Sequence, residues 1–218
     1  MKTLAIFGAG GLGIEILEMA QIINDITPKW DRYIFVNNGD KADPIFGVEV
    51  MGLDEAISQY GTDIDAVVAV GEPTLREKIS NQISQYGFSQ PTIIHPSVRI
   101  PASSTIGAGT CIFPGVYIST NVTIKNNVLI SPNAVIGHDN LVEDNAVISS
   151  TCVLAGMIHV KKNAYIGPSV TIKESLTIGE YSVAALGSVV FKDIEDGDLV
   201  IGNPARVSKR SNEKIFHA

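Results

Sequence analysis

The sequence predicts a parallel α/β domain in about the first 95 residues and a parallel β-helix in the remainder. Three observations support this fold class. An aliphatic residue recurs at every sixth position from Ile100 to Val190. A glycine-rich segment follows a short apolar run near the N-terminus, and strand-like and helix-like patterns then alternate up to His95. Helices and ordinary strands do not produce a six-residue period, whereas a β-helix with three short strands per coil does.

The α/β pattern covers residues 1–95. Buried-strand patterns occupy Leu4–Phe7, Tyr33–Val36, Ala66–Val70 and Ile93–Ile94, and helical patterns occupy Ile14–Ile23, Leu53–Tyr60 and Pro73–Tyr86. Strands that alternate with helices predict a parallel sheet with helices on its faces. The region has about half the length of a full dinucleotide-binding fold. Its helical pattern stops near His95, so we place the second domain at residues 96–218.

The six-residue pattern predicts five coils of eighteen residues. The repeated positions are Ile100, Ile106, Ile112, Ile118, Ile124, Ile130, Ile136, Val142, Ile148, Leu154, Val160, Ile166, Ile172, Ile178, Ala184 and Val190. The residue two positions earlier is usually small or apolar, so we expect both to point into the bore. Because the ends of a solenoid need caps, we expect the first domain to cap one end. Residues 196–210 should turn back as a final strand at the other.

Composition excludes several classes of function. The net charge of −7 argues against non-specific nucleic-acid binding, which needs a basic surface. The two cysteines, Cys111 and Cys152, have no metal-ligand spacing and are expected to stay reduced in a cytosol. The N-terminus lacks a signal-peptide pattern, and no run is long enough for a membrane span. We therefore expect a cytoplasmic protein.

The glycine-rich segment reads Gly8-Ala9-Gly10-Gly11-Leu12-Gly13 and lies between a predicted strand and a predicted helix. Such a loop lets the backbone approach a phosphate at a helix N-terminus, although a tight turn that binds nothing would look the same. A nicotinamide site usually has an acidic residue about 20 positions later. Asn37 and Asn38 end the second strand instead, which favours a smaller nucleotide or a nucleotide sugar.

His138 and Asp139 are candidates for acid–base chemistry. A histidine can accept a proton at cytosolic pH, and a neighbouring carboxylate can orient the ring; an inert surface histidine is the alternative. His159 follows 21 residues later, so the two histidines would not stack on one face. We therefore expect no metal site.

Small residues interrupt the later coils at Ala155-Gly156 and Ala185-Leu186-Gly187. A slender ligand could lie against the backbone there, or the glycines could simply ease the turns. The segment Gly202-Asn203-Pro204-Ala205-Arg206, followed by Lys209-Arg210, joins a rigid turn to three cations. It suits a phosphate group, or it is a solvated basic tail.

The whole pattern resembles a known family. The hexads, with Ile136-Gly137-His138-Asp139 and Gly202-Asn203-Pro204-Ala205, are similar to left-handed β-helix acyltransferases of the hexapeptide-repeat type. The added domain with its glycine-rich loop narrows the resemblance to bacterial nucleotide-sugar N-acetyltransferases of the bacillosamine and perosamine type, with sialic acid O-acetyltransferase relatives. These act in surface glycan biosynthesis. The resemblance implies a Rossmann-like first domain and a left-handed second one.

The resemblance also implies a homotrimer, acetyl-coenzyme A (acetyl-CoA) as co-substrate, and a nucleotide-linked amino sugar as acceptor. His138 would be the catalytic base and Asp139 its acidic partner. The residues expected at acetyl-CoA are Gly156, Gly167, Ala185, Gly187, Pro204 and Arg206. Those expected at the nucleotide sugar are Gly8, Ala9, Gly10, Gly11, Asn37 and Asn38. Some family members carry two aspartates in place of Asn37 and Asn38, so the nucleotide is left open.

Two other functions are compatible with the sequence. One is O-acetylation of a sialic acid, which would leave the glycine-rich loop without a diphosphate to bind. The other is a non-catalytic assembly module, in which the β-helix serves as a trimeric scaffold and acetyl-CoA does not bind.

Overall fold

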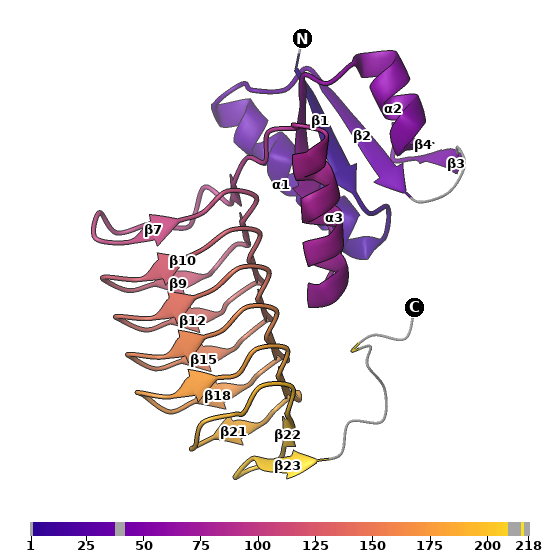
Figure 1. The fold of residues 1–218 in the computed structure, drawn as a ribbon. Helices are drawn as coiled ribbons and strands as arrows, with labels where there is room; N and C mark the ends of the chain where they lie inside the picture. The colour runs from indigo at the N-terminus through magenta and orange to yellow at the C-terminus, as the bar shows by residue number, and fades with distance from the viewer. Residues whose placement is uncertain (1, 38–41, 209–214, 216–218) are drawn as a thin grey trace.

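The computed structural model describes residues 2–37, 42–208 and 215, and it divides into an α/β domain and a β-helix (Figure 1). The α/β elements are β1 (Thr3–Phe7), α1 (Gly11–Ile26), β2 (Arg32–Asn37), β3 (Ala42–Ile45), β4 (Val48–Gly52), α2 (Leu53–Tyr60), β5 (Ile64–Val68) and α3 (Pro73–Gln85). Strands form one sheet in the order β3-β4-β2-β1-β5. Both predicted fold classes are therefore confirmed.

Alternating side chains place helices on both faces of this sheet. In β1, Leu4 and Ile6 join a buried cluster with Ile16 and Leu17 of α1, whereas Ala5 and Phe7 join a cluster with buried residues of α2 and α3. This is the two-residue alternation of a strand. The sheet is therefore covered on each face by helices.

The sheet differs from the predicted one in three details. β3 and β4 were not predicted, and β3 pairs antiparallel with β4, whereas the other neighbours are parallel. Pro44 and the exposed residues of β3 hide its strand pattern. β5 ends at Val68 rather than Val70. Ile93–Ile94 (β6) pairs with a β-helix strand instead of the α/β sheet.

The β-helix is built from strands of two residues, each ending on a repeated aliphatic position. They are β7 (Thr105–Ile106), β8 (Cys111–Ile112), β9 (Tyr117–Ile118), β10 (Thr123–Ile124), β11 (Leu129–Ile130), β12 (Val135–Ile136), β13 (Leu141–Val142), β14 (Val147–Ile148), β15 (Val153–Leu154), β16 (His159–Val160), β17 (Tyr165–Ile166), β18 (Thr171–Ile172), β19 (Thr177–Ile178), β20 (Val183–Ala184) and β21 (Val189–Val190). Strands pair in parallel at a spacing of eighteen residues, as in Ile124 with Val142. The predicted period is confirmed.

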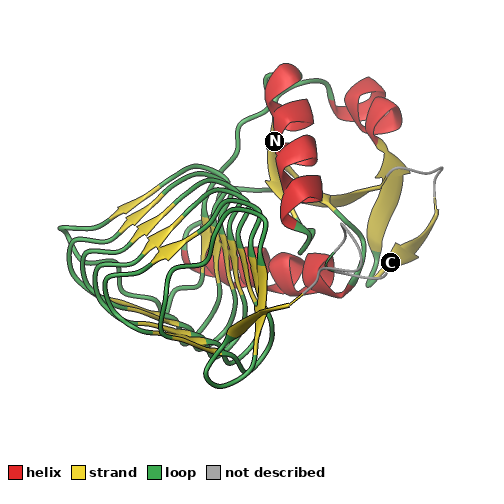
Figure 2. Cartoon of the chain, turned by 60° about the horizontal axis from the view of Figure 1, so that its bottom comes forward, coloured by secondary structure: helices red, strands yellow, loops and turns green. Residues whose placement is uncertain are grey.

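The β-helix has a triangular cross-section, and three sheets form its walls (Figure 2). The β7 sheet contains β7, β10, β13, β16 and β19, and the β9 sheet contains β9, β12, β15, β18 and β21. The third wall contains β6, β8, β11, β14, β17, β20, β22 (Leu199–Ile201) and β23 (Arg206–Ser208). We call it the domain-facing sheet, because its outward residues lie in the same buried cluster as α1.

Both predicted bore positions are buried. Residues such as Ile130 and Ile148 are fully enclosed, as are the small residues Ala134 and Cys152 two positions before repeated sites. Corners between strands place one residue in the left-handed region, with φ near 60° from Asn121 onward. The repeat therefore sets both the core and the corner conformation.

The α/β domain lies beside the β-helix and does not cap its end, which differs from our expectation (Figure 1). The outward residues of the domain-facing sheet explain this position. Cys111, Leu129, Val147, Tyr165 and Val183 are stacked at eighteen-residue intervals and are all buried. An apolar column of this length has to be covered along the side of the solenoid.

The far end follows the prediction within the described residues. β22 pairs in parallel with β20, and β23 turns back antiparallel to β22. The chain from residue 209 to 210, which also belongs to the predicted segment, lies outside the described residues.

Candidate active site

His138 and Asp139 occupy the corner between β12 and β13, where the β9 sheet meets the β7 sheet. The His138 Nδ1 atom lies 2.6 Å from Asp139 Oδ2. Asp139 is in the left-handed region with φ 57°, and its N–H donates to the carbonyl of Thr120 one coil earlier. Because a carboxylate only accepts hydrogen bonds, Nδ1 carries the proton. In the neutral form of the ring, the lone pair is therefore at Nε2.

Asn121 completes this arrangement and was not predicted. Its side-chain amide donates to the other carboxylate oxygen, Asp139 Oδ1, at 2.5 Å. These hydrogen bonds from Asn121 and His138 lower the pKa of Asp139, which keeps it ionised. Asn121 precedes Asp139 by eighteen residues, which is one coil. A search at that offset would have found it.

Gly156 lies one coil beyond His138 and leaves room for its ring. A Cβ atom at Gly156 would lie 2.5 Å from both Cε1 and Nε2 of His138. No side chain fits there without moving the imidazole. Of the residues predicted at acetyl-CoA, Gly156 is therefore the one that the structure brings to His138.

The other residues predicted at acetyl-CoA lie along a different corner, where the domain-facing sheet meets the β9 sheet. Gly167, Ala185 and Gly187 occupy successive coils there, and Gly187 faces open space. The turn containing Pro204 continues the column, since Ala205 N–H donates to the carbonyl of Val189. Arg206 follows it with an exposed side chain. Gly156 and this column thus flank the β9 sheet on its two edges.

The glycine-rich loop lies at the carboxyl end of β1. Gly8 has φ 127°, and a Cβ there would lie 2.5 Å from the carbonyl oxygen of Ala69. Gly13 packs as closely on the carbonyl of Gly8. Gly10 and Gly11 have open space where a side chain would stand. Two glycines therefore close the turn, and two leave the α1 N-terminus accessible.

Ala9, between them, is half-buried against the α1 cluster. Asn37 is the last residue of β2, at the same carboxyl edge of the sheet as the loop. Asn38 lies outside the described residues. The predicted nucleotide-binding residues that the structure describes therefore share one edge.

The glycine-rich loop and His138 do not meet within one chain. The α/β domain lies against the domain-facing sheet. His138 lies between β12 and β13, at the corner shared by the other two walls and therefore opposite the domain-facing sheet.

Two hollows were not predicted. One, of about 430 Å³, runs over the outer face of the β9 sheet and includes Arg99, Tyr117 and Thr120. Thr120 occupies the position of His138 one coil earlier, so this groove adjoins the histidine corner.

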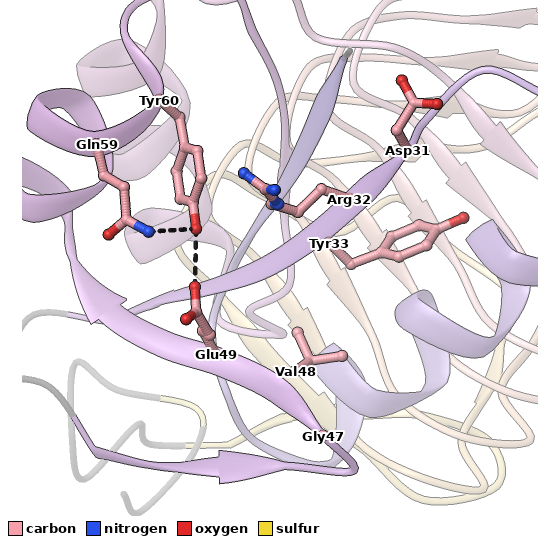
Figure 3. A pocket seen from close by; sticks show the side chains of 8 residues that line it. All are labelled: Asp31, Arg32, Tyr33, Gly47, Val48, Glu49, Gln59 and Tyr60. Carbon is pink, nitrogen blue, oxygen red and sulfur yellow. Dashed lines mark hydrogen bonds between the residues drawn. The ribbon is translucent and has the colours of Figure 1, made fainter.

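The other hollow, of about 480 Å³, lies at the amino ends of β2 and β4 (Figure 3). There Tyr60 donates a hydrogen bond to Glu49 at 2.7 Å, and the Arg32 guanidinium lies 4.8 Å from the Tyr60 ring. Parallel strands place this edge opposite the glycine-rich loop, so this hollow is separate from the candidate site.

Within the described residues, no cluster of three or more histidine, cysteine or acidic side chains could hold a metal ion. Likewise, none of the helices in the described ranges has the length and hydropathy to cross a membrane.

Cys111 and Cys152 are buried, and burial raises the pKa of each thiol to about 11.

Two family models match the chain, one in each domain. The PglD N-terminal domain model matches residues 3–83, and the GMPPB C-terminal domain model matches residues 88–183. GDP-perosamine N-acetyltransferase of Escherichia coli O157:H7 is 29% identical over 221 residues, covering 99% of this chain and 100% of the relative. Putative acetyltransferases of Staphylococcus aureus are 41% identical to this chain over 61 residues, and the chain spans 31% of their length.

Solved structures extend this similarity. The acetyltransferase domain of PglB from Neisseria gonorrhoeae FA1090, in complex with acetyl-CoA, has 27% identity and a TM-score of 0.85, covering 94% of this chain and 98% of that one. A mutant of perosamine N-acetyltransferase from Caulobacter crescentus, in complex with CoA and GDP-perosamine, has 27% identity and a TM-score of 0.87, covering 95% and 97%. The chain thus joins a PglD-type N-terminal domain to a hexapeptide β-helix, and its structural homologues are perosamine- and PglB-type nucleotide-sugar N-acetyltransferases.

Proposed function

We propose that this protein transfers an acetyl group from acetyl-CoA to the 4-amino group of a nucleotide-linked amino sugar. The hydrogen-bonded series from Asn121 through Asp139 to His138 supports the proposal most directly, because it orients an accessible histidine as a base. The homologues that contain CoA and GDP-perosamine support the substrate class.

His138 acts as the general base. The sugar amine attacks the thioester carbonyl, so a C–N bond forms and the C–S bond breaks. His138 Nε2 takes the proton that the nitrogen loses and returns it to the leaving sulfur. Asp139 holds the Nδ1 proton and stabilises the imidazolium while it exists.

The thioester reaches His138 along the β9 sheet. The pantetheine chain would lie along the second edge, at the half-buried Ala185 and the exposed Gly187, where no atom occupies the place of a Cβ on Gly187. Gly156 and Gly167 are buried and act by close packing: Gly156 makes room for the His138 ring, and Gly167 packs on the backbone of the next coil. Pro204 and Arg206 extend the second edge, where a guanidinium suits the phosphates of the coenzyme.

The α/β domain holds the acceptor. Amide groups at Gly10 and Gly11, at the start of α1, suit the diphosphate of a nucleotide sugar. Asn37 ends β2 at the same edge, and Asn38 is the next residue in the sequence. Asparagine both donates and accepts hydrogen bonds, so these side chains suit a base or a ribose.

The active assembly is a homotrimer in which β9 sheets face neighbouring subunits. The outward faces of the three walls support this. The domain-facing sheet is covered, and the β7 sheet carries exposed polar residues such as Thr123. The β9 sheet leaves Tyr117 and Val153 59% and 40% exposed. A neighbouring copy would cover this apolar face and bring its glycine-rich loop toward His138.

A thiol-release assay tests the function. Acetyl-CoA is supplied with GDP-, UDP- and dTDP-linked 4-amino sugars, and product is identified by mass spectrometry. We expect His138→Ala to lower kcat by about 10²–10⁴-fold, the usual contribution of a general base. Light scattering should give a trimeric mass for both proteins. An unchanged rate would remove His138 from the mechanism.

The same experiment separates the other functions that the sequence allows. Acetylation of a sialic acid hydroxyl, with no reaction of any amino sugar, would favour the O-acetyltransferase. A trimer that acetyl-CoA does not stabilise in a thermal-shift titration would favour a non-catalytic module.

A further inference from the structure

Arg76 in α3 is a fully buried cation, and in the described part of the chain it forms no ion pair. Its guanidinium donates only to neutral acceptors: the carbonyls of Val68, Val70 and Asn127, and the Asn127 side-chain oxygen. Burial lowers its pKa to about 10, so it stays charged at neutral pH. A buried charge is costly, and apolar replacements of buried ions are often more stable. Stability alone therefore does not explain this residue.

The acceptors of Arg76 belong to both domains. Val68 ends β5 and Val70 follows it in the α/β domain, whereas Asn127 is a corner residue of the β-helix with φ 53°. Asn127 also donates to the carbonyl of Arg76 and to Asn145, the equivalent residue one coil later. A planar guanidinium with fixed donor directions specifies orientation more sharply than an apolar contact does.

A second contact sets the direction of α3 along the β-helix. Glu77 accepts a hydrogen bond from Asn163 at 2.8 Å, and Tyr181 lies 3.5 Å away from the same carboxylate oxygen. Asn163 and Tyr181 continue the corner column of Asn127 and Asn145. Because neighbouring residues of one helix contact coils two apart, both the position and the tilt of α3 are fixed (Figure 1).

The contact with Arg76 continues directly to the glycine-rich loop. Val68 and Val70 flank Ala69, whose N–H donates to the carbonyl of Phe7. The carbonyl oxygen of Ala69 lies 2.5 Å from the place that a Cβ of Gly8 would occupy. A short series of hydrogen bonds and close contacts therefore joins the β-helix, through Arg76, to the loop that would hold the diphosphate.

We propose that Arg76 is a positioning residue for the acceptor: it fixes the glycine-rich loop relative to the β-helix, so that the amine of a bound nucleotide sugar reaches a histidine corner. The inference rests on the proposed function. It also explains the buried charge, since a cation that forms hydrogen bonds to both domains favours one orientation over others.

The kinetic test uses Arg76→Met, which keeps bulk but removes every donor, with Lys78→Met as control. Lys78 is exposed on the same helix. We expect Arg76→Met to lower kcat/KM for the nucleotide sugar by about 10–100-fold, as displaced reactants do. The Kd of acetyl-CoA, which would contact the β-helix, should stay within about twofold. The proposal would be overturned if kcat/KM for the nucleotide sugar and the affinity for acetyl-CoA fell by the same factor. Kinetics like those of Lys78→Met would also overturn it.

Asn127→Gly covers the case in which Arg76→Met does not fold. Glycine suits the left-handed φ and retains the carbonyl acceptor, but it removes the side-chain oxygen. We expect a smaller loss in the same direction, again with acetyl-CoA affinity retained. Native kinetics in Asn127→Gly, without a folded Arg76→Met, would count against the role of Arg76.

A distance measurement tests the orientation without using activity. Spin labels at Ser58→Cys and Thr123→Cys report on the two domains, and both sites are exposed while Cys111 and Cys152 are buried. Labelled chains are mixed with excess unlabelled chains. Arg76→Met should broaden or shift the distance distribution. If the native protein acetylates no nucleotide sugar, the proposed function fails, whereas an unchanged distribution would overturn the role of Arg76.

Discussion

The corner that carries His138 and the corner that carries Asn127 share a backbone conformation but have different surroundings. In the first column, Asn121 and Asp139 both have φ 57°; in the second, Asn127 and Asn145 have φ 53° and 60°. The first column is exposed, and its side chains orient a histidine. The second is buried under α3, and its side chains hold a neighbouring domain.

The difference teaches how a repeat acquires function. The aliphatic bore and the left-handed conformation of the corner residue recur in each coil, so they do not distinguish one corner from another. The side chains outside the bore distinguish the corners, and these side chains act in pairs separated by eighteen residues. Columns at that spacing are therefore the natural unit for assigning roles in this β-helix.

Gly156→Ala should give the largest effect at the histidine corner. The added Cβ would occupy the space of the His138 ring, while the backbone of Gly156 is outside the left-handed region and accepts alanine. We expect kcat to fall by about 10²–10⁴-fold, as for loss of the base itself. In a His138→Ala background the same change should add little. Additive losses would show that Gly156 acts independently.

Ile148→Ala should weaken both corners together, because the bore supports all of them. Ile148 is fully buried, and removing its outer carbons should lower the free energy of unfolding by about 2–5 kcal/mol. Urea denaturation measures this, with exposed Thr123→Ala as control. A free energy of unfolding equal to that of the native protein would contradict the view that the bore supports all the corners.

Asn121→Gly should act only at the histidine corner, and more strongly in acid. Its amide helps to hold the pKa of Asp139 below the ordinary value, so the native carboxylate stays ionised at lower pH. Without that donor, Asp139 gains its proton at a higher pH. We expect a few-fold loss of kcat near neutrality that grows as the pH falls toward the ordinary aspartate range. A pH–rate profile parallel to the native one would exclude this role.

Ser175→Gly should have the smallest effect. Ser175 is exposed in the same column as Asp139, two coils later, with φ 61°. Glycine relieves the cost of the left-handed conformation but orders a freer chain, so we expect a stability gain of at most about 1 kcal/mol. The rate should not change. Thermal unfolding and the thiol-release assay check both points.

Much of the fold could be predicted because its signals are local. The hexads gave the β-helix, and apolar runs gave β1, β2, α2 and α3 within a few residues. The position of the α/β domain could not be predicted, since the apolar column from Cys111 to Val183 becomes visible only at eighteen-residue spacing. β3 was not predicted, because Pro44 and exposed side chains interrupt its strand pattern.

The candidate site was predicted in the same uneven way. His138 and Asp139 stand next to each other in the chain, so their contact could be anticipated. Asn121 and Arg76 contact partners 18 and 51 residues away. Such contacts depend on coil stacking and domain docking, which no local pattern specifies.

The stacking of coils has a further consequence for how such proteins can diversify. Each coil advances the chain by one strand spacing, about 4.8 Å. An insertion or deletion of eighteen residues between Asn127, which holds Arg76, and His138 would shift the histidine corner along the axis by one such step relative to that contact and leave the bore unchanged. Acceptors of different length could thus be accommodated by whole-coil changes, with the chemistry at each corner left intact.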